Sequence, residues 1–332
     1  MKYSLKPSPS ETEFHWVKKT MKKLGSVISA QQFDKVTIEK VLSIAKEMEK
    51  VSKKPSQLLK GKIMATFFYE PSTRTRLSFE TAMKRLGGEV ISTENAKEFS
   101  SAAKGETLED SIRIVSNYAD VIVLRYHKEG GAERAEKFSK APVINAGDGP
   151  GQHPTQALLD LYTIKKSFNK LEGLKIAMVG DLANGRTVRS ICYFIAKHYP
   201  NNEIIFVSPK QTKMKNDIKK YLDANKMKWR ETDNLKKVLP EADVIYQTRV
   251  QKERFEDNPA VYKQVMKDSE NLILNKESLK LMKKNAIIMH PLPRITEITY
   301  DVDKDKRAMY FEEAQNGLYV RMALLKMIFL GY

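Results

Sequence analysis

The chain has 332 residues, of which 41% are hydrophobic and 30% charged, a composition typical of folded proteins long enough for two domains. No apolar run approaches the ~20 residues of a membrane-spanning helix, and no secretory h-region is recognisable, so we expect a cytoplasmic protein without membrane contact. The single cysteine, Cys192, excludes a disulfide within the chain and argues against a cysteine-based zinc site.

The formal net charge of +17 is compatible with nucleic-acid binding, which is an alternative of a different functional class. The lysines are scattered as pairs, such as Lys18–Lys19 and Lys283–Lys284, without zinc-finger spacing or a basic block interleaved with aromatic residues. We therefore expect a solvated basic surface that attracts small anionic substrates, and no nucleic-acid partner.

Short apolar runs alternate with helical patterns along the chain, beginning with a helix over residues 33–51. Strands are predicted over residues 63–69, 89–92, 121–124, 143–145, 174–179, 204–207, 244–247 and 287–289, and long helices over residues 154–168 and 313–330. The stretches between them have helical or loop-like patterns. This alternation predicts an α/β protein with two doubly wound parallel-sheet domains joined by long helices. We expect one domain over residues 1–168, completed by a C-terminal helix over 310–332, and the other over residues 169–309.

The segment Phe67-Phe68-Tyr69-Glu70-Pro71-Ser72-Thr73-Arg74-Thr75-Arg76 leads from a buried strand into a helix. Hydroxyl and guanidinium groups at a helix N-terminus join free backbone N–H groups and the helix dipole in attracting an anion. An ordinary helix N-cap with surface arginines is the alternative. Five consecutive anion-binding side chains, from Ser72 to Arg76, favour a phosphate site.

Two further segments place polar side chains after predicted strands. Ala146–Gln156 is a glycine-rich loop that brings His153 and Gln156 to a helix start, with Pro154 suited to the first helical turn. Asp181–Thr187 places Arg186 at another helix start, where it can hold a carboxylate, and it lacks the G-x-G-x-x-G of dinucleotide-binding folds. A capping histidine beside a structural glutamine is the alternative for the first segment.

The last two segments, Thr248–Arg254 and His290-Pro291-Leu292-Pro293, each follow an apolar strand. Ligands gather at the carboxyl ends of strands in open α/β sheets. A surface ion pair at Arg249 and a rigid turn at the prolines are the alternatives.

Taken in order, these segments resemble the motifs of the aspartate/ornithine carbamoyltransferase family. The resemblance spans the chain from about residue 33 to the last helix. It implies transfer of a carbamoyl group from carbamoyl phosphate to an amine, without a metal or an organic cofactor. The carbamoyl-phosphate site that it implies comprises Ser72, Thr73, Arg74, Thr75, Arg125, His153, Gln156 and the backbone carbonyls of Leu292 and Pro293. Of these, Arg74, Thr75, Arg125 and His153 would be the catalytic residues, with the last three polarising the carbonyl oxygen.

The same resemblance implies a homotrimer with shared active sites. Ser100 and Lys104 would reach the phosphate of a neighbouring subunit, and Lys104 would also contact the second substrate. Glu70 and Arg254 match positions that brace the closed domains through ion pairs. A regulatory chain or another enzyme of the pathway is a further candidate partner, although Ala183 stands where some regulated relatives carry a lysine.

The second substrate divides the family. Ornithine enzymes carry His-Cys-Leu-Pro where this chain has His290-Pro291-Leu292-Pro293, and they need an acidic group for the distal amine. Here Arg249 and Gln251 suit a second carboxylate instead, because an arginine facing a buried ammonium is unfavourable. We therefore expect L-aspartate, held by Arg186, Arg249, Gln251 and Lys104, and an early step of pyrimidine biosynthesis. Ornithine carbamoyl transfer is the alternative.

Overall fold

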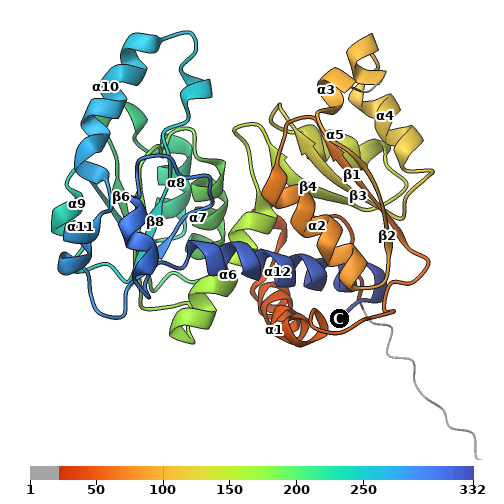
Figure 1. Ribbon diagram of the computed structural model, residues 1–332, viewed down its shortest axis with the longest axis horizontal. Helices are drawn as coiled ribbons and strands as arrows, with labels where there is room; N and C mark the ends of the chain where they lie inside the picture. Colours follow the sequence, from red (N-terminus) through yellow and green to blue (C-terminus); the bar gives the residue numbers. More distant parts are fainter. Residues whose placement is uncertain (1–21, 100) are drawn as a thin grey trace, which may run out of the picture.

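The computed structural model describes residues 22–99 and 101–332, and it confirms the two parallel sheets (Figure 1). The first sheet has the order β2-β1-β3-β4, with β1 Ile63–Phe68, β2 Glu89–Thr93, β3 Val121–Tyr126 and β4 Val143–Asp148. The second has the order β7-β6-β5-β8-β9, with β5 Lys175–Val179, β6 Glu203–Val207, β7 Lys228–Thr232, β8 Val244–Gln247 and β9 Ile287–Met289.

Helices follow most strands, as the parallel connections require. In the first half they are α1 Lys35–Val51, α2 Thr73–Arg85, α3 Ala96–Phe99, α4 Leu108–Val115, α5 Gly131–Phe138 and α6 Pro154–Phe168. In the second half they are α7 Arg186–His198, α8 Asn216–Ala224, α9 Leu235–Val238, α10 Pro259–Ser269, α11 Lys276–Leu281 and α12 Tyr310–Leu330.

Alternate residues of each strand pack against helices on opposite faces of the sheet. Met64 and Phe68 of β1 face a core shared with α1, α2 and α12, whereas Ala65 and Phe67 face a separate core with α4. In β5, Met178 belongs to the larger core. Burial on both faces explains the almost continuous apolar runs by which these strands are recognised.

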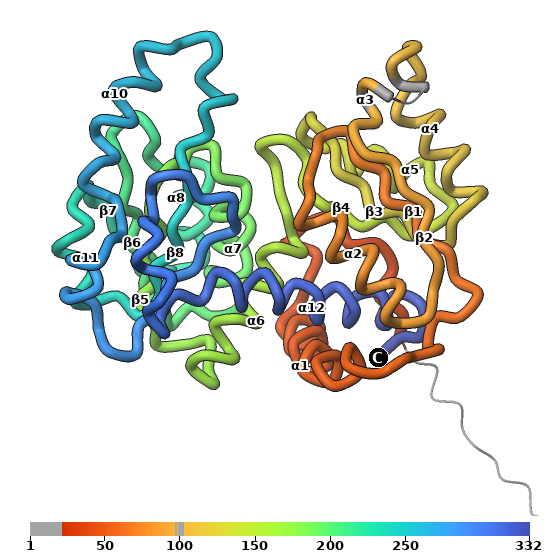
Figure 2. The backbone as a smooth tube through the Cα atoms, viewed as in Figure 1, coloured from red at the N-terminus to blue at the C-terminus, as the bar shows by residue number. Residues whose placement is uncertain are grey.

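The two sheets lie side by side, connected by α6 and α12 (Figure 2). The last helix, α12, packs against α1, α2 and α6 beside the first sheet. It begins at Tyr310, the first residue of the C-terminal helix expected over 310–332 and three residues before the start of the 313–330 helical pattern. Cys192 is fully buried in α7, as expected of a core residue.

One strand was missed. Residues 228–232, within a stretch assigned helical or loop-like patterns, form β7 at the edge of the second sheet. Its sequence, Lys-Trp-Arg-Glu-Thr, has no Val/Ile run because an edge strand is covered less completely, and its residues are exposed or half-buried. β3 and β4 run well beyond their predicted ends: β3 includes Arg125, and β4 continues into the glycine-rich loop as far as Asp148.

Candidate active site

A cavity of about 970 Å³ lies between the carboxyl ends of the two sheets. Its walls come from the segments that follow β1, β3 and β4 on one side and β5, β8 and β9 on the other. In each sheet the chain reverses its direction of winding at the centre, between β1 and β3 and between β5 and β8. Such reversal points open a crevice where ligands of α/β proteins bind.

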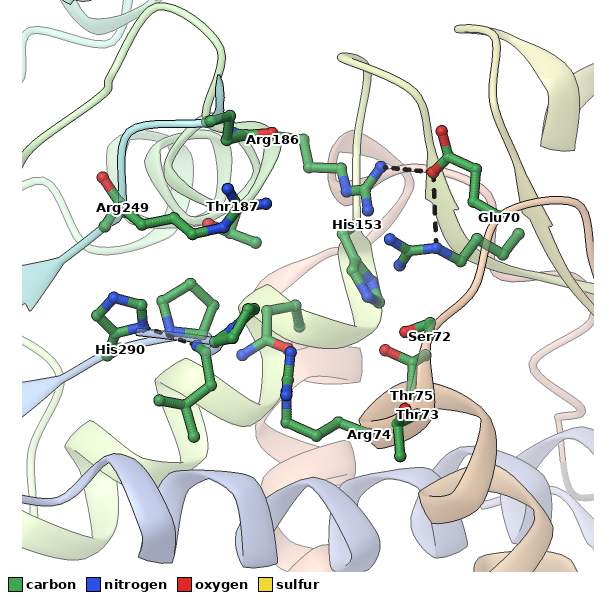
Figure 3. A pocket seen from close by; sticks show the side chains of 18 of the residues that line it. Glu70, Ser72, Thr73, Arg74, Thr75, His153, Arg186, Thr187, Arg249 and His290 are labelled. Atoms are coloured by element: carbon green, nitrogen blue, oxygen red, sulfur yellow. Dashed lines mark hydrogen bonds and ion pairs between the residues drawn. The ribbon is translucent and has the colours of Figure 1, made fainter. Parts of the chain in front are cut away.

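The N-terminus of α2 forms one wall of this cavity. Ser72 is the N-cap residue, and its hydroxyl caps no helix N–H among the described residues, so it is available to a ligand. Arg74 extends into the cavity from the first turn (Figure 3). Burial and the positive charge of Arg249, which lines the same cavity, lower the pKa of Arg74. Thr73 and the buried Thr75 complete this wall.

Arg76, the last member of the pentad, points away from this wall. Its guanidinium contacts Glu94 at 2.8 Å and Glu80 at 3.5 Å, and it does not line the cavity. The structure therefore corrects the anion-binding pentad to the four residues from Ser72 to Thr75. Residues two positions apart on an α-helix, such as Arg74 and Arg76, point to nearly opposite faces.

Glu70 lies between two largely buried arginines, one from β3 and one from the start of α7 (Figure 3). Its Oε2 is 3.6 Å from Nε of Arg125 and 3.8 Å from Nη1 of Arg186. Burial, followed by the charge of Arg186, lowers the pKa of Arg125 to about 9, so Arg125 stays protonated at neutral pH. Arg254 lines the same cavity, and no ion pair joins it to the described residues, whereas Glu70 approaches Arg186 of the other half of the chain.

The Arg186 side chain reaches across the cavity because Gly147 has no side chain that would block it. Its Nη1 donates to the carbonyl oxygen of Gly149 at 2.8 Å. Gly147 adopts φ +112°, and a Cβ there would lie 3.0 Å from Cζ of Arg186. A side chain at position 147 would therefore be strained and would crowd the guanidinium. The glycines of the Ala146–Gln156 loop thus serve the contact between the two sheets.

His153 is the N-cap residue of α6 and is almost fully buried beside the cavity. Burial, with the charges of Arg186 and Arg125, lowers its pKa well below the usual value, so the imidazole is neutral at pH 7. Thr155 Oγ1 lies 3.3 Å from Nδ1. A hydroxyl donating to Nδ1 leaves the proton on Nε2, where it can be donated to a ligand.

On the opposite wall, Arg249 and Gln251 follow β8. Arg249 pairs with Glu253, and Nη1 lies 3.1 Å from Oε2 of that residue. Gln251 donates from Nε2 to the carbonyl oxygen of Asn184 at 3.1 Å, so the loops after β5 and β8 are tied together. Gly180 permits this approach, because a Cβ there would lie 2.2 Å from the carbonyl oxygen of Thr248.

The turn after β9 forms the floor of the cavity. The Leu292 N–H donates to Nδ1 of His290 at 2.7 Å, and Nε2 of His290 therefore carries the proton that it donates to Glu297 at 2.8 Å. Leu292 and Pro293 line the cavity and are joined by a cis peptide bond. Gln156 reaches the same floor from α6.

The sequence-predicted residues are therefore gathered in one place, with two exceptions. Ser100 lies outside the described residues, and Lys104 is exposed in the 3-10 helix η2 (Ser101–Lys104) and does not line this cavity. The sequence analysis missed Glu313 and Arg321 of α12, both buried and both lining the cavity. Charged residues within a largely apolar helix were the available signal, because buried charges need a specific reason.

Over the described ranges, 22–99 and 101–332, no group of three or more His, Cys, Asp or Glu side chains is placed to hold a metal ion. Within the same ranges no helix is both long and apolar enough to cross a membrane. The cavity instead concentrates arginines, which suit ligands with phosphate and carboxylate groups.

Comparison with known proteins agrees with this site. Residues 26–166 match the family model "Aspartate/ornithine carbamoyltransferase, carbamoyl-P binding domain", and residues 172–328 match "Aspartate/ornithine carbamoyltransferase, Asp/Orn binding domain". The chain is 56% identical over 311 residues to aspartate carbamoyltransferase 1, chloroplastic, of Pisum sativum, covering 93% of this chain and 80% of the relative. It is 50% identical over 307 residues to the aspartate carbamoyltransferase catalytic subunit of Methanocaldococcus jannaschii, covering 90% and 96%.

Solved structures show the same likeness. The catalytic subunit of M. jannaschii aspartate transcarbamoylase superimposes with a TM-score of 0.84 at 49% identity, covering 92% of this chain and 98% of the other. Aspartate transcarbamoylase from Trypanosoma cruzi in complex with carbamoyl phosphate and aspartate gives a TM-score of 0.86 at 35% identity, covering 92% and 96%. The chain therefore belongs to the aspartate/ornithine carbamoyltransferase family and is a carbamoyltransferase.

Proposed function

We propose that this enzyme transfers the carbamoyl group of carbamoyl phosphate to the α-amine of L-aspartate, giving N-carbamoyl-L-aspartate and phosphate. One observation carries the proposal: a single cavity joins the anion-binding N-terminus of α2 to Arg186 and Arg249 of the second sheet. Relatives at 50–56% identity bear the name aspartate carbamoyltransferase. The product is a precursor of pyrimidines.

The first domain, residues 1–168 completed by the helix at 310–332, binds carbamoyl phosphate in this proposal. Ser72, Thr73, Arg74 and Thr75 hold the phosphate through side chains and the free N–H groups of the first turn of α2. Arg125 reaches both the phosphate and the carbonyl oxygen. The carbonyl oxygen gains negative charge in the transition state, and Thr75, Arg125 and the Nε2–H of the neutral His153 stabilise it there.

The second domain, residues 169–309, binds L-aspartate. Arg186 takes the α-carboxylate, and Arg249 and Gln251 take the β-carboxylate. Each arginine then exchanges a protein partner for substrate, since Arg186 contacts Glu70 and Arg249 contacts Glu253. Cys192 is buried in α7 and the turn after β9 carries Pro291, so the cysteine-containing turn of ornithine enzymes is absent from this part of the described chain.

The chemistry then needs orientation more than a dedicated protein base. The carbamoyl NH2 donates to Gln156 Oε1 and to the carbonyl oxygens of Leu292 and Pro293, which fixes the plane of the reacting carbon. The neutral α-amine of aspartate attacks that carbon, the C–O bond to phosphate breaks, and the departing phosphate accepts the proton. Closure of the two domains around both substrates supplies much of the rate through positioning.

A homotrimer with shared sites completes the proposal. Lys104 is exposed and does not line the cavity of its own chain, as expected of a residue that serves a neighbouring subunit together with Ser100. A regulatory chain or another pathway enzyme is a further candidate partner, and the M. jannaschii relative is named a catalytic subunit. We keep the cytoplasm as the proposed location, although the plant relatives are named chloroplastic.

The purified full-length chain should be assayed with carbamoyl phosphate and either L-aspartate or L-ornithine. N-carbamoyl-L-aspartate formed by the wild type and lost in Arg74→Ala supports the proposal. Citrulline formed from L-ornithine would instead overturn the assignment of Arg249 and Gln251 to a carboxylate. Absence of both products from a trimeric preparation would overturn the proposed reaction.

A further inference from the structure

A buried polar cluster lies beneath the cavity, and the mechanism above uses only one of its members. We call Gln156, Asp160, Tyr246, Glu313 and Arg321 the Asp160 cluster. Its residues come from α6, β8 and α12, so it joins both sheets. Asp160 and Tyr246 are fully buried, and Glu313 and Arg321 are 1% and 3% exposed. Burying ionisable groups lowers the stability of the folded protein unless they are paired and hydrogen-bonded. A buried cluster of this size therefore calls for a functional explanation.

Asp160 and Glu313 bring two buried carboxyl groups to the same amide nitrogen, Gln156 Nε2, which lies 2.9 Å from Oδ1 of Asp160 and 3.4 Å from Oε1 of Glu313. Two carboxyl groups that share a buried site do not both ionise, so one of them is protonated. Asp160 is the better site for the negative charge, because it accepts from Tyr246 Oη at 2.8 Å and from Gln156 Nε2 at 2.9 Å. It also feels the charge of Arg321, the buried cation of the cluster. Burial raises the pKa of Asp160 to about 7, and burial with the negative charge of Asp160 raises the pKa of Glu313 well above its usual value. Above pH 7, Asp160 therefore carries the charge and Glu313 is the neutral partner.

This arrangement fixes which end of the Gln156 carboxamide faces the substrate. Gln156 Nε2 donates to Asp160 Oδ1 at 2.9 Å and lies 3.4 Å from Glu313 Oε1. An ionised carboxylate accepts only N–H or O–H groups, so the amide nitrogen must point toward Asp160. The amide oxygen of Gln156 is thereby left for the cavity, where it can accept from an NH2 group but not from a methyl group.

Glu313 also positions the turn that forms the floor of the cavity. Its Oε2 accepts the backbone N–H of His290 at 2.8 Å. That contact anchors the start of the turn whose Leu292 and Pro293 line the cavity. The carbamoyl NH2 has three assigned acceptors, one from α6 and two from the turn after β9. All three are therefore positioned by contacts with the buried pair Asp160 and Glu313.

We propose that Asp160 and Glu313 are positioning residues that impose selectivity for an NH2 group on the ligand's carbonyl carbon, by orienting the Gln156 carboxamide and anchoring the turn after β9. This inference rests on the proposed function of the cavity. Neither residue has a direct role in the reaction. Together they would make the enzyme discriminate between carbamoyl phosphate and acyl phosphates of the same size.

The test uses two stable phosphonates that differ only at the position in question. Phosphonoacetamide carries the amide NH2, and 2-oxopropylphosphonate carries a methyl group in its place. Their dissociation constants would be measured by calorimetry at pH 8 for the wild-type trimer and for Asp160→Leu, Asp160→Asn and Glu313→Gln. Binding of inorganic phosphate reports in parallel that each variant is folded and that its anion site is intact.

We expect the wild type to prefer phosphonoacetamide, because the methyl analogue leaves buried acceptors unpaired. In Asp160→Leu the carboxamide of Gln156 loses its acceptor, and the preference should fall roughly tenfold or more while phosphate binding is retained. Asp160→Asn keeps a carbonyl acceptor and should restore part of the preference. Glu313→Gln should retain most of it, because glutamine mimics a protonated glutamate.

An equal loss of affinity for both phosphonates in Asp160→Leu would overturn the proposal, since a merely structural role weakens both alike. So would a Glu313→Gln variant that loses as much preference as Asp160→Leu, which would show that Glu313 carries the charge. A wild type that binds neither phosphonate nor phosphate would refute the proposed function of the cavity instead. If Asp160→Leu does not fold, Glu313→Leu in comparison with Glu313→Gln gives the same contrast through the His290 anchor.

Discussion

Replacement of Glu70 by glutamine should weaken the protein without ligands and strengthen its hold on phosphate. Glu70 is the carboxylate nearest to both Arg125 and Arg186, at 3.6 and 3.8 Å. Without that charge, two buried guanidinium groups lose their shared counter-ion. In the variant, a bound phosphate supplies the missing negative charge and is no longer repelled by a neighbouring carboxylate. The substitution should therefore lower stability without phosphate and raise the affinity for phosphate.

The magnitude follows from the geometry. At an effective dielectric constant of about 20, each of the two attractions amounts to about 4.5 kcal/mol before desolvation is subtracted. Removing one partner of a buried pair costs about 3–5 kcal/mol, and exposed pairs contribute at most about 1 kcal/mol. The Glu70 side chain is 29% exposed, which places it between these limits. We expect a loss of about 2 kcal/mol in unfolding free energy, and a melting temperature lower by about 3 °C for a chain of this size.

The assay is thermal melting of wild type and Glu70→Gln with and without phosphate, together with phosphate titration by calorimetry. The variant should melt lower without phosphate, bind phosphate roughly fivefold more tightly (a gain of about 1 kcal/mol), and gain more stability than wild type at saturation. Glu203→Gln is the matched control, because Glu203 pairs with Lys228 and Arg230 at 3.1 Å outside the cavity. That control should lose stability without any change in phosphate affinity.

The reasoning about Glu70 would be refuted by a variant that is as stable as wild type without phosphate. It would equally be refuted by weaker phosphate binding in Glu70→Gln, since that outcome would mean that the carboxylate organises the anion site rather than competing with the anion.

Four further outcomes are expected. Arg74→Ala should lower kcat/KM for carbamoyl phosphate by at least roughly 100-fold in steady-state assays, with an unchanged melting temperature, because Arg74 forms no ion pair with the described residues. Arg249→Ala should raise KM for L-aspartate roughly 100-fold and leave phosphate affinity, measured by calorimetry, near that of wild type. The pKa of His153 is lowered in the folded protein, so the unfolded chain binds a proton at higher pH and the folded state loses stability as the pH drops below about 6.5. The melting temperature of His153→Gln should therefore fall less than that of the wild type between pH 7 and pH 5. Lys104→Ala and Arg74→Ala should each be inactive alone, and trimers re-formed from a mixture should recover part of the activity; failure to recover any would contradict shared sites.

Much of the fold could be read from the sequence because its strands are buried on both faces. β8, β9 and α6 have the predicted boundaries, since a continuous apolar run or an N1 proline marks each of them. The edge strand β7 could not be predicted in this way. Its half-buried residues are held by pairing with β6, which no local pattern reveals.

The candidate site divides in the same manner. The sequence alone determined which segments carry anion-binding chemistry, because a polar residue set at a strand end or a helix start has a local physical meaning. Only the tertiary structure decided that Arg76 turns away, that Glu70 lies between Arg125 and Arg186, and that Asp160 and Glu313 meet at the amide nitrogen of Gln156. These contacts join residues far apart in the chain across two sheets. Their pKa values depend on burial and on neighbours that only the folded chain brings together.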